Sequence, residues 1–287
     1  MSNVRALLSL ALVVPLVACG DDGGGSTPID ASQQTIDAPL AIDAPLPIDA
    51  PIDAPVDAPN YDFSCLGNSA PTTATATVTL TGFGRELTLN GATPSLQAAT
   101  NATITACKGD CEGANNLGST FVSSSGTFST ASLATGNTPL DGHLRASKTG
   151  NWPTRLYPAS PLVADQANVP VLMITNSAVG IIGLVAPGNQ TQSANNGIVG
   201  MFVTDCSNEP IASGATVTFT HIGTNTEITS VINAGQFTGQ AAGGYIATNV
   251  PPGDVTVAAS YNGMVLRAHV VPSVASTVTT TQIRPGW

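Results

Sequence analysis

Charged and aromatic residues are scarce in this sequence. Only 9% of its 287 residues are charged and 5% are aromatic, and the eight Lys and Arg residues stand singly along the chain. A nucleic-acid-binding surface needs Lys and Arg clustered on one face. The composition therefore argues against a nucleic acid as partner, and the abundance of Thr, Val, Gly and Asn indicates short strands and turns.

Long hydrophobic runs are lacking as well. The apolar run over residues 4–17 is too short for a membrane-crossing helix, which needs about 20 residues. We interpret residues 1–18 as a signal peptide. Its end, Leu16-Val17-Ala18-Cys19, resembles the lipobox of bacterial lipoproteins, which implies cleavage before Cys19 and lipid on its thiol. The alternative is a plain signal peptide with a chance cysteine. The flexible polar stretch that follows Cys19 favours the lipoprotein.

Acidic residues are concentrated in the segment 19–60. Eight of the 18 carboxylates lie between Asp21 and Asp57, where the tripeptide Asp-Ala-Pro recurs. Proline removes backbone donors and the carboxylates repel one another, so we expect a disordered, extended linker. From Tyr61 onward the chain has ten acidic and seven basic residues and is close to neutral.

Beyond Tyr61, threonine and apolar residues alternate in short runs that turn residues separate. A period of two predicts β-strands with one buried face. The expected strands lie at residues 73–80, 102–107, 201–203, 216–220, 255–260, 265–271 and 277–283. The predicted fold class is all-β, with two tandem sandwiches after the linker.

The apolar segment 177–185 breaks this alternation. Asn176 is placed to be a helix N-cap and Pro187-Gly188 to be a stop, so residues 176–196 are predicted to be a short helical connector. A weak repeat of turns and strands on either side supports a first sandwich at residues 61–175 and a second at residues 197–287.

Turn residues in the second half resemble those of a known family. They are Gly200-Met201-Phe202-Val203-Thr204-Asp205, Pro210-Ile211, Gly214-Ala215-Thr216-Val217, Gly235-Gln236-Phe237 and Pro251-Pro252-Gly253. Over about residues 197–285 they look like the carboxypeptidase regulatory-like domain, and residues 70–175 resemble it more faintly. The resemblance implies transthyretin-like or immunoglobulin-like Greek-key sandwiches and says little about function.

Side chains suited to metal binding or catalysis are few and scattered. His143, His221 and His269 each stand alone on an expected strand, whereas a metal site needs ligands that converge. Tyr157 resembles one ligand of the intradiol dioxygenases, whose iron is held by two tyrosines and two histidines. The closely spaced Tyr and His that should follow are missing. We expect no catalytic residue, no metal and no cofactor.

Two acidic pairs flank cysteines in expected loops. Asp110 and Glu112 flank Cys111, and Asp205 and Glu209 lie on either side of Cys206. Carboxylates of this kind can bind Ca²⁺, but neither pair approaches an EF-hand pattern. A charged turn is the default interpretation of both.

The cysteines indicate disulfides. Apart from Cys19, the sequence has Cys65, Cys107, Cys111 and Cys206, an even number in an exported protein. Three pairings are open, and a zinc site is the rival interpretation. We expect Cys107 to pair with Cys111 in a short loop and Cys65 to pair with Cys206.

The expected function is that of a membrane-anchored, non-catalytic envelope lipoprotein that presents its sandwiches for binding or adhesion. An envelope protein or a glycan is the expected partner, besides the membrane that the lipid enters. The alternatives are an accessory subunit of an envelope complex and an enzyme with an unrecognised site, such as an intradiol-dioxygenase-like one. The residues alone do not identify the ligand.

Replacing Cys19 with Ser tests the lipid anchor. Without the thiol no acyl group is attached, so we expect Cys19→Ser to block processing and to move the protein from the detergent phase to the aqueous phase. Phase partitioning and the mass of the mature N-terminus measure both effects. A variant that partitions and migrates like the parent would contradict the anchor.

Overall fold

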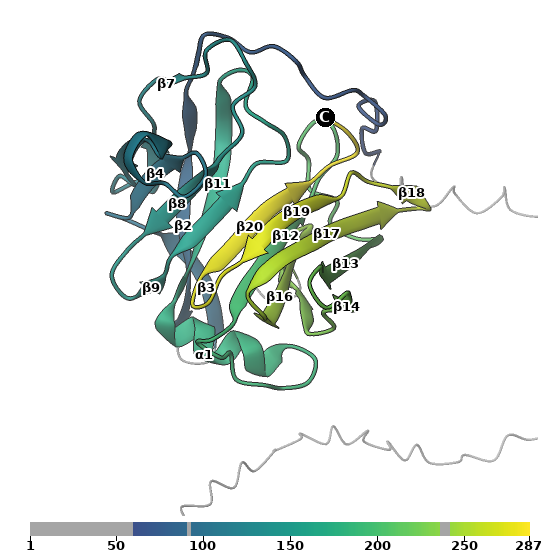
Figure 1. The fold of residues 1–287 in the computed structure, drawn as a ribbon. Coiled ribbons are helices and arrows are strands. Elements are labelled where there is room, and N and C mark those ends of the chain that lie inside the picture. The colour runs from purple at the N-terminus through teal and green to yellow at the C-terminus, as the bar shows by residue number, and fades with distance from the viewer. Residues whose placement is uncertain (1–59, 91–92, 236–241) are drawn as a thin grey trace, which may run out of the picture. The chain divides into compact units, whose positions relative to one another are not determined.

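The computed structural model describes residues 60–90, 93–235 and 242–287. The expected signal peptide, the lipidation site Cys19 and the linker up to residue 59 lie outside the described residues, as do Gln236 and Phe237 of the family resemblance. The described part of the chain is drawn in colour in Figure 1.

The described residues form twenty β-strands and one α-helix, α1 (Asn176–Val185), with a 3-10 turn at Gly113–Asn115. The strands of the first half are β1 (Thr77–Val78), β2 (Leu80–Asn90), β3 (Thr93–Ala98), β4 (Thr103–Cys107), β5 (Asn116–Phe121), β6 (Thr127–Ser129), β7 (Leu133–Ala134), β8 (His143–Ser147), β9 (Asn151–Trp152), β10 (Thr154–Tyr157) and β11 (Gln166–Thr175). Those of the second half are β12 (Gly197–Val203), β13 (Ala215–His221), β14 (Thr226–Glu227), β15 (Val231–Asn233), β16 (Gly244–Val250), β17 (Gly253–Tyr261), β18 (Met264–Val265), β19 (His269–Ser273) and β20 (Val278–Ile283).

An eight-stranded sheet runs through both halves of the sequence. Its strand order is β15-β16-β12-β20-β10-β8-β4-β5, so four strands of the second half lie beside four of the first. The junction is the parallel pairing of β10 with β20, in which Thr154 is opposite Val278 and Tyr157 is opposite Thr281. This sheet is the central sheet of the molecule.

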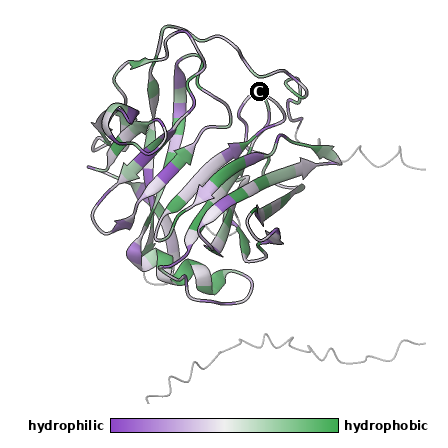
Figure 2. Ribbon diagram, viewed as in Figure 1, coloured by the Kyte–Doolittle hydropathy of each residue, from purple (hydrophilic) through white to green (hydrophobic). Residues whose placement is uncertain are grey.

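Two smaller sheets cover opposite faces of the central sheet. One has the order β3-β2-β11-β9 with β6 beside β2, and the other has the order β14-β13-β17-β18 with β19 beside β17. Ile198 of β12 packs into a core with residues of β2 and β11, whereas its neighbour Val199 packs with residues of β13 and β17. Neighbouring residues of a strand point to opposite faces, so the two covers lie on opposite sides. Figure 2 shows the corresponding alternation of hydrophobic and hydrophilic residues along the strands.

The all-β sandwich class expected from the sequence is confirmed. One sandwich encloses a core around Ile104, Leu144 and Met173, and the other encloses a core around Met201 and Phe219. The two sandwiches share the central sheet, which continues across the expected boundary at residues 176–196.

Several local expectations are wrong in detail. Residues 73–76 alternate in type but lie outside the strands. The expected strand at 265–271 is split into β18 and β19, because Leu266 turns into the core and is only 1% exposed. The N-cap of α1 is Thr175 and not Asn176, since the Thr175 hydroxyl accepts a hydrogen bond from the Ala178 N–H at 3.3 Å.

Candidate functional site

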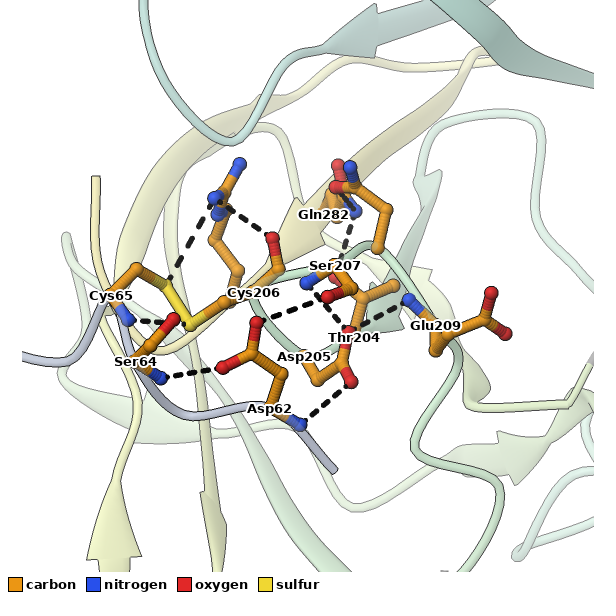
Figure 3. The surroundings of a disulfide bond; sticks show 11 residues. Asp62, Ser64, Cys65, Thr204, Asp205, Cys206, Ser207, Glu209 and Gln282 are labelled. Atoms are coloured by element: carbon orange, nitrogen blue, oxygen red, sulfur yellow. Dashed lines mark hydrogen bonds between the residues drawn. A yellow bond between two sulfur atoms is a disulfide. The ribbon is translucent and has the colours of Figure 1, made fainter. Parts of the chain in front are cut away.

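The disulfide between Cys65 and Cys206 fastens the start of the described chain to the loop after β12 (Figure 3). The Cys206 N–H donates to the Asp62 carbonyl at 2.8 Å, and Leu66 forms an isolated bridge with Gly286. The second disulfide joins Cys107 to Cys111. Both disulfides link the cysteines that the sequence analysis paired.

The carboxylate of Asp205 organises the loop beside the first disulfide. It is 3% exposed and accepts backbone N–H groups of Asp62, Ser207 and Glu209 at 2.8 to 2.9 Å (Figure 3). The Asp62 carboxylate in turn accepts hydrogen bonds from the Ser64 N–H and, at 3.0 Å, from the Ser207 hydroxyl. These hydrogen bonds lower the pKa of Asp62. The carboxylate of Asp205 therefore uses its oxygens to bind backbone N–H groups of the turn, as the interpretation as a charged turn predicts.

Asp110 has the same role in the loop between β4 and β5. Its carboxylate accepts the Asn115 side-chain amide at 2.8 Å and the Glu112 N–H at 3.0 Å, which lowers the pKa of Asp110. The carboxylate is exposed and ties the turn that the disulfide between Cys107 and Cys111 closes.

Two of the three histidines hold local structure. The Nε2 of His221 lies 3.1 Å from the Pro252 carbonyl, and its Nδ1 accepts the Thr224 N–H at 3.3 Å. The Nδ1 of His269 lies 2.7 Å from the Thr281 hydroxyl. Burial, with a contribution from Arg267, lowers the pKa of His269. Neither histidine is on its own a reactive group.

His143 and Tyr157, by contrast, are brought together. Their strands, β8 and β10, are neighbours, and the two rings stack with centroids 4.9 Å apart. Burial lowers the pKa of His143 to about 4, and the charges of Arg155 and Arg145 add to this effect. Burial also raises the pKa of Tyr157. At neutral pH both rings are therefore uncharged.

Metal ligands do not gather in the described ranges. No group of three or more His, Cys, Asp or Glu side chains lies there in an arrangement that could hold an ion. Two histidines lie near Tyr157. The ring of His143 stacks on the Tyr157 ring, and His269 contacts Thr281, the residue opposite Tyr157 on β20.

A cavity of about 550 Å³ opens between the central sheet and the sheet of β2 and β11. Its walls are mainly apolar side chains, among them Leu80, Phe83, Leu156, Val171, Leu172 and Phe202. Phe83 and Phe202 are half-buried. The cavity has the size and apolar lining of small-molecule sites in proteins. These six residues come from separate strands and carry no motif, so they could not be recognised as candidates from the sequence, whereas His143 and Tyr157, which also line the cavity, could.

Polar side chains also line this cavity, among them His143 and Tyr157. Arg85 and Glu209 are exposed, and Gln282 donates to Thr204 and Asn208 at 2.7 and 3.1 Å. The Arg85 guanidinium lies 5.8 Å from the centre of the Phe83 ring. A ligand with an apolar body and one polar end would match this lining.

Comparison with known proteins gives only distant similarities. No protein-family model and no curated protein matches the chain. The shaft pilin of Lactobacillus rhamnosus GG is 12% identical over 75% of this chain and 99% of its own, with a TM-score of 0.22. The minor pilin of Streptococcus agalactiae is 10% identical over 73% and 96%, with a TM-score of 0.21. A type II cohesin–X-dockerin complex of Acetivibrio cellulolyticus is 14% identical over 36% of this chain and 60% of its own, with a TM-score of 0.24. We draw no functional conclusion from similarities this low.

Within the described ranges, no helix has the length and apolar character needed to span a membrane.

Removal of the disulfide between Cys65 and Cys206 tests its role as a fastening. Because it closes a loop with a sequence separation of 141, we expect the double change Cys65→Ser and Cys206→Ser to lower the free energy of unfolding by about 2–4 kcal/mol. Urea unfolding without reductant measures the loss. The matched control is Cys107→Ser with Cys111→Ser, whose separation is only 4 and whose loss should be smaller. Equal losses would contradict the prediction.

The buried His143 predicts a specific pH dependence of stability. Because its pKa is about 4 in the folded state and about 6.5 when unfolded, the unfolded chain binds more protons between these values, and stability falls as the pH drops from 6.5 to 4. His143→Phe keeps a ring against Tyr157 and removes the titration. We expect the parent to lose about 2 kcal/mol more than this variant between pH 7 and pH 4.5. Parallel stability curves from urea unfolding would disprove the assignment.

Proposed function

We propose that this chain is a lipid-anchored protein of the bacterial envelope that binds a small apolar or amphipathic molecule without transforming it. The cavity of about 550 Å³ between the sheets is the observation that carries the proposal. The anchor at Cys19 and the membership of the carboxypeptidase regulatory-like family are parts of it that rest on sequence features.

Binding without chemistry is favoured by how the reactive side chains are used. Asp205 and Asp110 hold backbone N–H groups, and His221 and His269 hold loop and strand neighbours. The pKa of about 4 leaves His143 uncharged at neutral pH, under the ring of Tyr157. A general base needs an acceptor directed at substrate. The two aspartates, His221 and His269 have structural partners, whereas His143 and Tyr157 stack on each other and line the cavity.

The ligand class follows from the lining. Apolar side chains from both sheets, leucines above all, make up most of the wall, so burial of an apolar body provides the affinity. Arg85 and Glu209 are the exposed charged side chains of the lining. They are suited to orient a single polar end near solvent.

An environment-sensitive apolar dye tests this proposal. The parent should bind the dye with enhanced fluorescence, and long-chain fatty acids should displace it. Val169 is half-buried and lines the cavity, so Val169→Trp fills space there and should weaken dye binding by about tenfold or more.

The matched control is Val265→Trp. Val265 is 74% exposed on β18 and does not line the cavity, so this change adds the same ring elsewhere and should leave dye binding unchanged. Thermal unfolding checks that both variants fold. The proposal fails if the parent does not bind the dye, or if the two variants bind it equally.

A further inference from the structure

Two arginines lie directly opposite each other on the central sheet. Arg145 of β8 and Arg155 of β10 are register partners in an antiparallel pair. The alternate residues Leu144, Ala146 and Leu156 point into the core under the sheet of β2 and β11. The two arginines therefore point to the other face of the central sheet, where Arg145 is exposed and Arg155 is half-buried. We call this the arginine face.

Like charges in this position disfavour the fold. Side chains directly opposite on neighbouring strands lie about 5 Å apart at Cβ, and like charges there are destabilising. Across the described ranges the only ion pair within 4.0 Å is that of Lys148 with Glu86. Neither guanidinium of the arginine face thus has a carboxylate to neutralise it. Their charges reach the adjacent ring of His143, whose pKa both arginines lower.

Most other basic residues of this nearly neutral body have a partner in the fold. Lys148 pairs with Glu86 at 2.9 Å, and Arg267 lies 3.8 Å from the centre of the Trp287 ring. The Arg284 guanidinium donates to the Cys206 carbonyl at 3.5 Å. Arg267 and Arg284 thus have partners in the fold but, like the arginine face, no carboxylate within 4.0 Å, and Arg155 has a hydrogen bond with Tyr157. The arginine face differs in that Arg145 is exposed, whereas Arg267 and Arg284 are half-buried.

The surface around the two arginines carries hydroxyl groups. Thr105 of β4 is opposite Arg145, and Ser119 of β5 is opposite Thr105, so one row across four strands reads Ser119, Thr105, Arg145, Arg155. The Thr105 and Ser119 hydroxyls are 2.9 Å apart, and Ser147, two residues along β8, is exposed. Thr105 is buried, so the exposed hydroxyls beside the two positive charges are those of Ser119 and Ser147.

The acidic groups near this face lie toward its other end. Burial raises the pKa of Tyr157, and the charges of Asp141 and Asp254 add to this effect; Asp141 also acts on His269. Tyr157 lies two residues beyond Arg155 on β10. An anion is therefore attracted to the end that carries the two guanidinium groups and repelled from the end near Asp141.

We propose that the arginine face binds an acidic polysaccharide, with a carboxylate of the chain held between Arg145 and Arg155 and the neighbouring sugar hydroxyls bonded to Ser119 and Ser147. Guanidinium groups form strong paired hydrogen bonds with carboxylates. A peptide partner would need buried apolar anchors. A large apolar side chain, Phe121, is 67% exposed on this face, but it lies at the end of β5, two strands from Arg145.

Polygalacturonate is the probe for the test, with dextran as the neutral control. The purified full chain in detergent should bind polygalacturonate and not dextran, and binding should weaken as salt is added. Arg145→Gln and Arg155→Gln should each weaken it by about tenfold or more. Isothermal titration calorimetry measures the affinities.

One variant separates binding from folding. Arg155→Glu replaces repulsion across the strand pair by attraction, so its Tm should equal or exceed that of the parent while polygalacturonate binding is lost. Lys108→Gln is the matched control, since it removes an exposed positive charge from the loop after β4 and should leave binding unchanged.

The proposal is overturned by any of three results. The first is that the parent fails to bind polygalacturonate, and the second is that Lys108→Gln weakens binding as much as Arg145→Gln. The third is that an acidic peptide such as polyglutamate binds equally well and depends on the same arginines. The outcome is independent of the cavity, because Val169→Trp should not change polygalacturonate binding. Loss of binding in that variant with its fold intact would place the polysaccharide in the cavity and would also overturn the arginine face.

Discussion

The parallel pairing of β10 with β20 is the contact on which the arrangement of the molecule depends. It joins four strands of the first half to four of the second in one sheet. The threonines at this junction are buried, and their hydroxyls bond to backbone: Thr154 donates to the Leu172 carbonyl at 2.9 Å and Thr279 to the Pro272 carbonyl at 2.8 Å. Threonine suits such a position because its branched side chain packs on a pleated sheet while its hydroxyl finds a carbonyl.

The shared sheet determines where surfaces are left for function. One cover, built on β2 and β11, packs against one face of the central sheet, and the other, built on β13 and β17, packs against the opposite face in the second half. The first cover leaves the cavity next to Phe202 and Gln282. On the opposite face of the first half, Arg145, Ser147 and Ser119 remain exposed. The cavity also reaches His143, Tyr157 and Thr281, which alternate with the residues facing the first cover, so it extends beyond that face of the central sheet.

Local sequence patterns predicted the local structure well. The alternation at residues 102–107 gave β4, the apolar break gave α1, and the spacing of four cysteines gave both disulfides. The pairing of β10 with β20 joins residues more than a hundred positions apart, and no local pattern encodes that register. The split between β18 and β19 at Leu266 depends on a tertiary contact for the same reason.

The two candidate surfaces could not be predicted, because both are products of packing. The cavity is space left between side chains of separate strands. Arg145 and Arg155 are only ten residues apart in the sequence, but β9 lies between their strands and pairs with β11 in another sheet, so no hairpin pattern indicates that they meet.

The positions of Arg145 and Arg155 in the central sheet test one structural explanation for these two charges. Charged side chains often protect exposed edge strands from pairing with other chains. The edge strand at this end of the central sheet is β5, whose sequence, Asn-Leu-Gly-Ser-Thr-Phe, carries no charge. The two arginines lie instead on β8 and β10, each of which has a neighbouring strand on both sides. Edge protection therefore does not explain them, which is consistent with the proposed binding of an external anion.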